Sequence, residues 1–139
     1  MLTWTRYYIS FLRNTAAMGN TFTQKSDETW RDGNDCLDRG LINLAANRIY
    51  YSVLQAIKGF AVEKKGWSVH DSDNVHVKAL NIICGSGGGK GHGFRRRFSE
   101  LRALRITADY YPEDVDAQEL KALVNDADMI RMHHIKNAG

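Results

Sequence analysis

The stretch NRIYY, residues 47–51, lies inside a long apolar segment that covers residues 41–67. An arginine beside two tyrosines is unusual on such a helix. A buried arginine must be paired, because removing a charge from water is costly. The sequence therefore predicts a carboxylate elsewhere in the chain that pairs with Arg48. Apolar residues recur along this segment at the spacing of a helix: Ile42, Ala45, Ile49, Val53, Ala56 or Ile57, and Phe60.

The composition indicates one globular domain. The chain has 139 residues, of which 43% are hydrophobic and 25% charged, and its one proline favours helices. A net charge of +3 is compatible with a nucleic-acid partner without requiring one. Two cysteines form no disulfide framework, and no zinc-ligand spacing is present, so we expect a cytoplasmic protein without a metal or another cofactor. No apolar run is long enough to span a membrane.

The N-terminal half predicts an extension followed by two helices. Residues 1–22 form the extension, and residues 23–139 form the helical domain. The extension is either a short accessory helix that packs on the core or on a partner, or a loosely ordered segment; its apolar residues at helical spacing are Trp4, Tyr7 or Tyr8, Phe11 and Leu12. A first core helix is expected over residues 26–39, with Ser26 or Asp27 as its cap, and the central helix over residues 41–65. Gly40 and Gly66 are expected to end these helices.

The C-terminal half predicts three more helices. Ser72 or Asp73 is the expected cap of the third helix, residues 75–84, and residues 85–93 read as a flexible glycine-rich loop. A fourth helix is expected over residues 94–110. Asp116 and Glu119 form a capping-box pattern at the start of the last helix, which is expected to end near Asn137. The sequence therefore predicts an all-α protein, an up-and-down antiparallel bundle of four to five helices.

The glycine run matches no nucleotide-binding motif. Gly91 follows Lys90 where a P-loop needs serine or threonine, and no register gives the dinucleotide pattern. The histidines also lack metal-ligand spacing. A basic run in the same region predicts either contacts with a phosphate backbone or a solvated helix face. It consists of Lys90, His92, Arg95, Arg96, Arg97, Arg102 and Arg105.

Asp109 is the carboxylate that the central helix requires. It lies four residues after Arg105, so the two share one face of the fourth helix. A network that joins Arg48, Tyr50 or Tyr51, Arg105 and Asp109 would satisfy the arginine and the tyrosine hydroxyls. With the adjacent Tyr110, these residues form a predicted structural polar cluster.

Two short motifs resemble those of the HEPN domains, which are small helical bundles. They are NRIYYS, residues 47–52, and RITADY, residues 105–110, and the resemblance covers residues 26–137. It implies a homodimer with a cleft across the two-fold axis. Many HEPN proteins are ribonuclease toxins paired with a small nucleotidyltransferase antitoxin. Their signature is an arginine followed, after four to six residues, by a histidine.

No arginine in this chain has a histidine at that spacing. We therefore expect a non-catalytic module that binds nucleotide, RNA or a partner protein. Its predicted ligand-binding residues are Arg48, Tyr51, Arg95, Arg96, Arg102 and Arg105. The alternatives are a divergent metal-independent ribonuclease, with Arg105, Tyr110 and His76 or His92 in the cleft, and a purely structural interaction protein.

Overall fold

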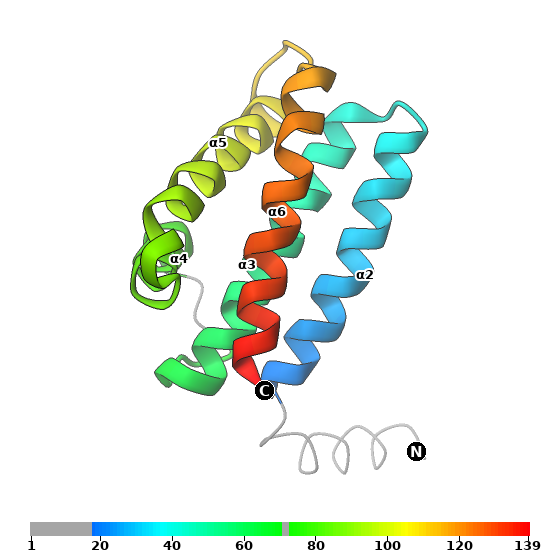
Figure 1. Cartoon of the computed structure of the whole chain (residues 1–139). Helices are drawn as coiled ribbons and strands as arrows, with labels where there is room; N and C mark the ends of the chain where they lie inside the picture. The colour runs from blue at the N-terminus through cyan, green and yellow to red at the C-terminus, as the bar shows by residue number, and fades with distance from the viewer. Residues whose placement is uncertain (1–17, 71–72) are drawn as a thin grey trace, which may run out of the picture.

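The protein is a helical bundle. The computed structural model describes residues 18–70 and 73–139, and none of these forms a β-strand (Figure 1). The predicted all-α bundle of four to five helices is therefore confirmed. Its elements are α2 (Met18–Asp38), α3 (Ile42–Lys65), α4 (Val75–Ser86), the 3-10 turn η2 (Gly88–Lys90), α5 (Gly91–Tyr110) and α6 (Ala117–Ala138).

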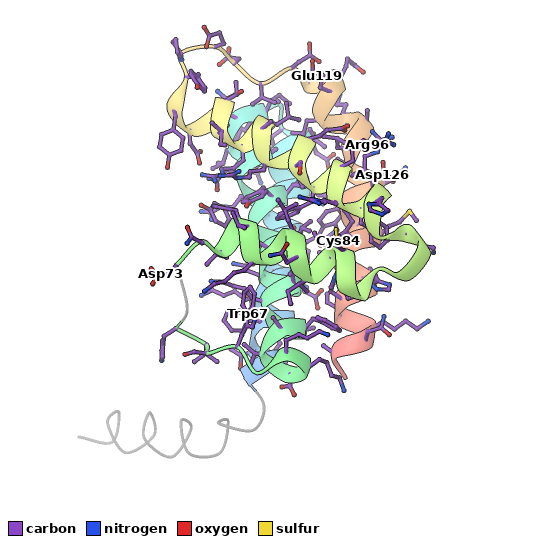
Figure 2. The ribbon with its side chains drawn as sticks, turned by 90° about the vertical axis from the view of Figure 1, so that its left-hand side faces the viewer. Trp67, Asp73, Cys84, Arg96, Glu119 and Asp126 are labelled. Carbon is purple, nitrogen blue, oxygen red and sulfur yellow. The ribbon has the colours of Figure 1, made fainter. Side chains whose placement is uncertain are left out.

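The helix α3 is the centre of the bundle. It packs against α2, α5 and α6, and less extensively against α4. Figure 1 shows α6 in front of α3, with α2 on one side and α5 on the other. In Figure 2, α4 lies across the direction of α3. The core that these helices enclose is formed mainly by Ala45, Ile49, Tyr50, Val53, Ile57, Ala79, Ile83, Phe98, Leu101, Leu120 and Ile130.

The helix α2 begins at Met18, so the start predicted near residue 26 is wrong. Ser26 caps nothing, because it is buried within α2 and its hydroxyl donates to the carbonyl oxygen of Ser52 on α3, at 2.7 Å. The two helices also approach closely at Gly33, where an added Cβ would lie 2.9 Å from Cγ1 of Ile49. Part of the predicted accessory helix, residues 1–17, falls outside the described residues.

The predicted flexible loop over residues 85–93 is also wrong, because most of that run is helical. The helix α4 extends to Ser86, and α5 already begins at Gly91. A Cβ on Gly87 would lie 2.7 Å from the Cα of Gly91, so the two backbones approach more closely than any other residue allows. Glycine here permits a compact junction between two helices.

Three predicted helix ends are confirmed. Gly40 and Gly66 have φ of 76° and 71°, the left-handed conformation that favours glycine. The Asp116 side chain accepts from the backbone N–H of Glu119 at 2.9 Å. At α4, however, the capping position is Asn74 rather than Asp73, and Ser72 lies outside the described residues. No helix in the described ranges is long and apolar enough to cross a membrane.

Candidate functional site around Arg105

Arg105 is one of two buried arginines among the described residues. It lies in the last turns of α5 and is 5% exposed. Its guanidinium carbon is 5.0 Å from the ring centre of Tyr50, 5.5 Å from that of Tyr51 and 6.0 Å from that of Tyr110. Nη1 of Arg105 is 3.5 Å from Oδ2 of Asp109. Three aromatic rings and one carboxylate thus replace much of the water around this cation.

Arg48 was predicted to be buried and paired with Asp109, and this is wrong. Arg48 is exposed, and among the described residues it has no ion pair. The preceding residue, Asn47, takes the expected place: its Nδ2 donates to both carboxylate oxygens of Asp109, at 3.2 and 3.1 Å. One residue along a helix turns the side chain by about 100°. That rotation moves Arg48 away from α5 and brings Asn47 to it.

His76 joins the cluster from the first turn of α4. One ring nitrogen, Nδ1, hydrogen-bonds the Tyr50 hydroxyl, and the other, Nε2, is 3.4 Å from Nη2 of Arg105. Arginine can only donate, so Nε2 must accept, and the proton of the neutral ring is assigned to Nδ1. Burial, followed by the charges of Arg102, Arg105 and Lys58, lowers the pKa of His76. The ring is therefore neutral at pH 7.

Tyr50 holds the centre of the cluster in the core. It is fully buried, and its ring stacks on Phe98 with a centroid distance of 5.2 Å. Burial raises the pKa of the Tyr50 hydroxyl, although Arg105 and Arg102 act in the opposite direction. Tyr50 therefore remains a neutral hydrogen-bonding group that orients His76, and it supplies no nucleophile at physiological pH.

The other predicted basic residues separate into two groups. Arg95 and Arg102 lie toward α4: Nη1 of Arg95 is 4.0 Å from Sγ of Cys84, and Arg102 is close enough to His76 to affect its charge state. Arg96 is exposed and lies nine residues before Arg105, so it projects from roughly the opposite side of α5. The structure therefore brings Arg95, Arg102 and Arg105 to one side of α5 and leaves Arg96 outside. His92 is exposed at the start of α5.

Polar atoms on the Arg105 side of the bundle lack partners. The Nε atoms of Arg102 and Arg105 and the Oε1 atom of Gln55 are buried without a hydrogen-bond partner. Arg48, Tyr51, Gln55 and Lys58 recur at helical spacing along α3, and each is at least partly accessible. Sequence reasoning missed Gln55 and Lys58, although their spacing from Arg48 was visible.

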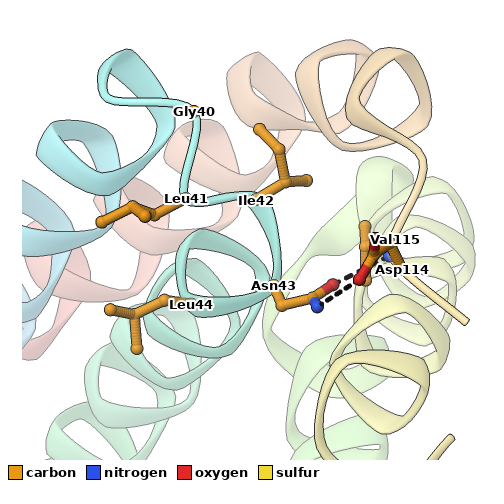
Figure 3. Close-up of a pocket in the computed structure, with 7 residues that line it drawn as sticks. All are labelled: Gly40, Leu41, Ile42, Asn43, Leu44, Asp114 and Val115. Carbon is orange, nitrogen blue, oxygen red and sulfur yellow. Dashed lines mark hydrogen bonds between the residues drawn. The ribbon is translucent and has the colours of Figure 1, made fainter. Parts of the chain in front are cut away.

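A shallow pocket of about 480 Å³ lies at the end of the bundle nearest Asp109. Figure 3 shows Asn43 bridging α3 to the loop before α6: its Nδ2 donates to Asp114 at 3.0 Å, and its Oδ1 accepts from the N–H of Val115 at 2.8 Å. Leu41 and Leu44 beside it are 49% and 46% exposed. The pocket is lined by Gly40, Leu41, Ile42, Asn43, Leu44, Asp114 and Val115. Asp114 is the ionisable residue in this lining, and Asn43 donates to its carboxylate.

A second buried arginine, Arg131, has a structural role that the sequence did not reveal. Its Nη1 is 2.5 Å from Oδ1 of Asp27 on α2, and its Nη2 is 3.2 Å from Oδ1 of Asp128. Its guanidinium also stacks over Trp30 at 5.0 Å. The contacts with Asp27 and Trp30 join α6 to α2, whereas Asp128 lies on α6 itself. Within the described residues, no group of three histidine, cysteine or acidic side chains could hold a metal ion.

Comparison with known proteins gives one clear finding. Residues 20–137 match the family model described as the HEPN domain. That range covers nearly all of the described bundle, including both motifs that meet at Arg105. A search of curated proteins found no match.

Proposed function

Because the chain belongs to the HEPN family, we propose that it is a non-catalytic, RNA-binding helical module of a toxin–antitoxin or defence-type system in the cytoplasm. The observation that supports this proposal best is that two arginines, one on α3 and one on α5, carry charges without an ion pair. Arg105 is paired with Asp109, whereas Arg48 and Arg102 have no ion pair among the described residues. Unpaired arginines beside an accessible tyrosine suit an anionic ligand with exposed bases.

The arrangement of these residues fits RNA better than a single isolated phosphate. Arg48 and Lys58 lie ten residues apart on α3, about 15 Å along the helix axis. Tyr51 lies between them and is partly exposed. A row of cationic side chains interrupted by an aromatic ring can bind several successive nucleotides. The phosphates would contact the cations, and a base would stack on the ring. A nucleotide would engage only part of the same surface.

Catalysis is disfavoured by the engagement of His76. Both of its ring nitrogens have protein partners, Tyr50 and Arg105. A general base must be free to accept a proton from the substrate within hydrogen-bonding distance. A ligand would have to displace Arg105 from Nε2 before His76 could act. The His76 ring therefore fits a role in positioning Arg105.

Fluorescence anisotropy with a labelled single-stranded RNA tests the proposal. Replacing both Arg48 and Arg102 with alanine should weaken binding at least tenfold and reduce the salt dependence by roughly two phosphate contacts. The control is Arg31→Ala, since Arg31 is an exposed arginine on the outward side of α2. Equal binding by all three proteins would refute the RNA proposal. Competition by mononucleotide would show whether nucleotide is the smaller ligand.

Two further parts of the proposal concern partners. We propose that the module works as a homodimer and that it binds a nucleotidyltransferase-type antitoxin, as its family membership suggests. Co-expression with a small nucleotidyltransferase encoded beside it would test the second part. Joint elution of the two proteins in size-exclusion chromatography is the expected result, and separate elution would oppose it.

The contact between Arg105 and His76 favours a second candidate, a divergent metal-independent ribonuclease. The Nη2–Nε2 distance of 3.4 Å places an arginine and a neutral histidine together although their spacing in sequence is not that of the family signature. Tyr110, the third residue of this candidate, is 73% exposed beside them. RNA cleavage that persists in EDTA and disappears in both His76→Ala and Arg105→Ala would establish this activity in place of simple binding.

A further inference from the structure

Two grooves follow one another along the seam where α5 packs against α6. The first has a volume of about 410 Å³ and lies beside the first half of α6. The second, of about 400 Å³, lies beside the second half of α6 and the start of α5. The apolar lining of the first consists of Ala103, Leu104, Ala122 and Leu123, and that of the second of Phe94, Met129, Met132 and Ile135.

One row of α6 side chains passes along both grooves. Its members recur at intervals of three or four residues, so they share one side of the helix: Glu119, Ala122, Asp126, Met129, His133 and Lys136. From Glu119 to Lys136 the row is about 26 Å long. Figure 2 shows Glu119 near the start of α6 and Asp126 farther along it. The two grooves are therefore parts of one elongated surface, which we call the α5–α6 surface.

The shape of the α5–α6 surface suits a helix. Met129 and Met132 are 50% and 46% exposed, and methionine side chains adapt readily to an apolar partner. Ala103 and Ala122 are also exposed, and their short side chains leave room for a third helix to approach the α5–α6 pair. An amphipathic helix binds such a groove with its apolar face.

The end of the α5–α6 surface at the first groove is acidic. Glu100 and Glu119 border this groove, and Asp126 follows on α6. Arg97 is the cation in the lining, and it is already paired with Glu100 at 3.1 Å and with Asp126 at 3.2 Å. Three acidic residues and one arginine give this end a formal charge of −2. An RNA phosphate backbone would be repelled here.

The opposite end of the α5–α6 surface is basic. Lys90 and Lys136 border the second groove. The exposed Arg96 lies seven residues before Ala103, so it is on the same side of α5 and toward this end. Opposite charges at the two ends of an apolar groove select a ligand by its charge order, because a helix bound in the wrong direction places like charges together.

We propose that the α5–α6 surface binds an amphipathic helix of a partner protein, with its acidic end at Lys90 and Lys136 and its basic end at Glu100 and Glu119. A helix with an acidic first turn and a basic last turn is also stabilised by its own dipole. It would therefore run parallel to α5 and antiparallel to α6. This proposal does not depend on RNA binding, because the row from Arg48 to Lys58 lies on α3.

Fluorescence anisotropy with two labelled peptides and the full-length protein tests the proposal. Each peptide has about 18 residues, which as a helix span the surface, and carries leucines at intervals of three and four residues. The matched peptide has glutamates in its first turns and lysines in its last turns. The reversed peptide has these charges exchanged. The matched peptide should bind at least tenfold more tightly than the reversed one.

A charge exchange on α6 tests whether this preference arises at the α5–α6 surface. Combining Glu119→Lys with Lys136→Glu keeps the net charge of the protein and should abolish the preference, because each end becomes nearly neutral. The matched control combines Lys25→Glu with Glu28→Lys, two exposed positions on α2, and should leave the preference unchanged.

An apolar variant tests the groove itself. Met129→Glu should weaken binding of the matched peptide about tenfold, whereas Val77→Glu, at an exposed apolar residue on α4, should not. Circular dichroism melting of each variant checks that the bundle remains folded.

Several outcomes would overturn the proposal. Equal affinity for the two peptides, or a preference that survives the charge exchange on α6, would show that this surface does not select a helix. A halved mass in light scattering after that exchange would assign the surface to a second copy of the chain. Displacement of the matched peptide by single-stranded RNA would assign it to RNA. Peptide binding in a protein that binds no RNA would support this proposal and refute only the RNA proposal.

Discussion

Arg105 contacts several buried groups at once, and we expect its removal to destabilise the protein strongly. Arg105→Ala should lower the free energy of unfolding by about 3 kcal/mol, because it removes stacking on three tyrosines and leaves a void among buried groups. Asp109→Asn should cost less, about 1 kcal/mol, since the Asp109 side chain is 28% exposed and can be hydrated. Urea unfolding followed by circular dichroism measures both values.

The control for this prediction is Arg48→Met. Arg48 is exposed, so its replacement should change stability by less than about 0.5 kcal/mol. A loss at Arg48 as large as that at Arg105 would mean that Arg48 is a buried structural residue after all. The same substitution, Arg48→Met, should weaken RNA binding even though it leaves stability unchanged.

His134 predicts a pH dependence of stability. It is fully buried, Nδ1 donates to the carbonyl oxygen of Ile130, and Nε2 lies 2.8 Å from the hydroxyl oxygen of Ser86. Burial is the main cause that lowers the pKa of His134 to about 4, from its ordinary value of 6.5. The unfolded chain therefore binds the proton more readily. The stability that comes from the neutral His134 ring is fully present above pH 6.5 and is lost as the pH falls to about 4.

The loss should reach up to about 3 kcal/mol, which urea unfolding at a series of pH values between 7 and 4 can measure. His134→Gln removes the titration while retaining a polar side chain. Its stability should change less than that of the parent protein over the same range. An identical slope in both proteins would assign the effect to other groups.

At the scale of the helices, the junction between α4 and α5 makes a sharp prediction for glycine substitutions. Gly87→Ala should destabilise the protein by about 2 kcal/mol or more, because its Cβ would lie 2.7 Å from the backbone Cα of Gly91. Gly85→Ala and Gly93→Ala have no atom within 4 Å of the new Cβ and lie inside helices. These two should be neutral or stabilising by up to about 1 kcal/mol. Thermal melts of the three variants make the comparison.

The same junction shows where local reasoning about elements failed. A run rich in glycine reads as a flexible loop, since glycine costs helix stability at each position. Here Gly87 and Gly91 approach so closely that neither position has room for a side chain. The packing of the two helices compensates for the helix stability that glycine costs. That contact becomes visible only when α4 and α5 are placed together.

At the scale of the whole molecule, we predict a homodimer. Exposed apolar side chains remain at the end of the bundle where α3 begins and α5 ends: Leu41, Leu44, Tyr110 and Tyr111. Patches of this kind commonly mark protein interfaces. Light scattering at micromolar concentration should give twice the chain mass of 15.8 kDa. Leu41→Glu should shift the mass toward the monomer, and Val77→Glu, on α4, should not. A monomeric parent protein would refute the prediction.

Patterns within short windows of the chain identified the central helix, several helix ends and the family. Apolar spacing located α3, two glycines located helix ends, and the pair Asp116–Glu119 located the start of α6. These features depend on neighbours within a turn or two, so no distant contact is needed to interpret them. The i, i+4 spacing also identified the ion pair between Arg105 and Asp109.

The partner of Asp109 on α3 could not be obtained in this way. Asn47 and Arg48 differ by about 100° around the same helix, and only the packing of α3 against α5 determines which one faces Asp109. The contacts of His76 with Arg105 and of Arg131 with Asp27 likewise join residues 29 and 104 positions apart. Helical spacing carries no information over such separations. Packing therefore buries Arg105 and leaves Arg48 exposed.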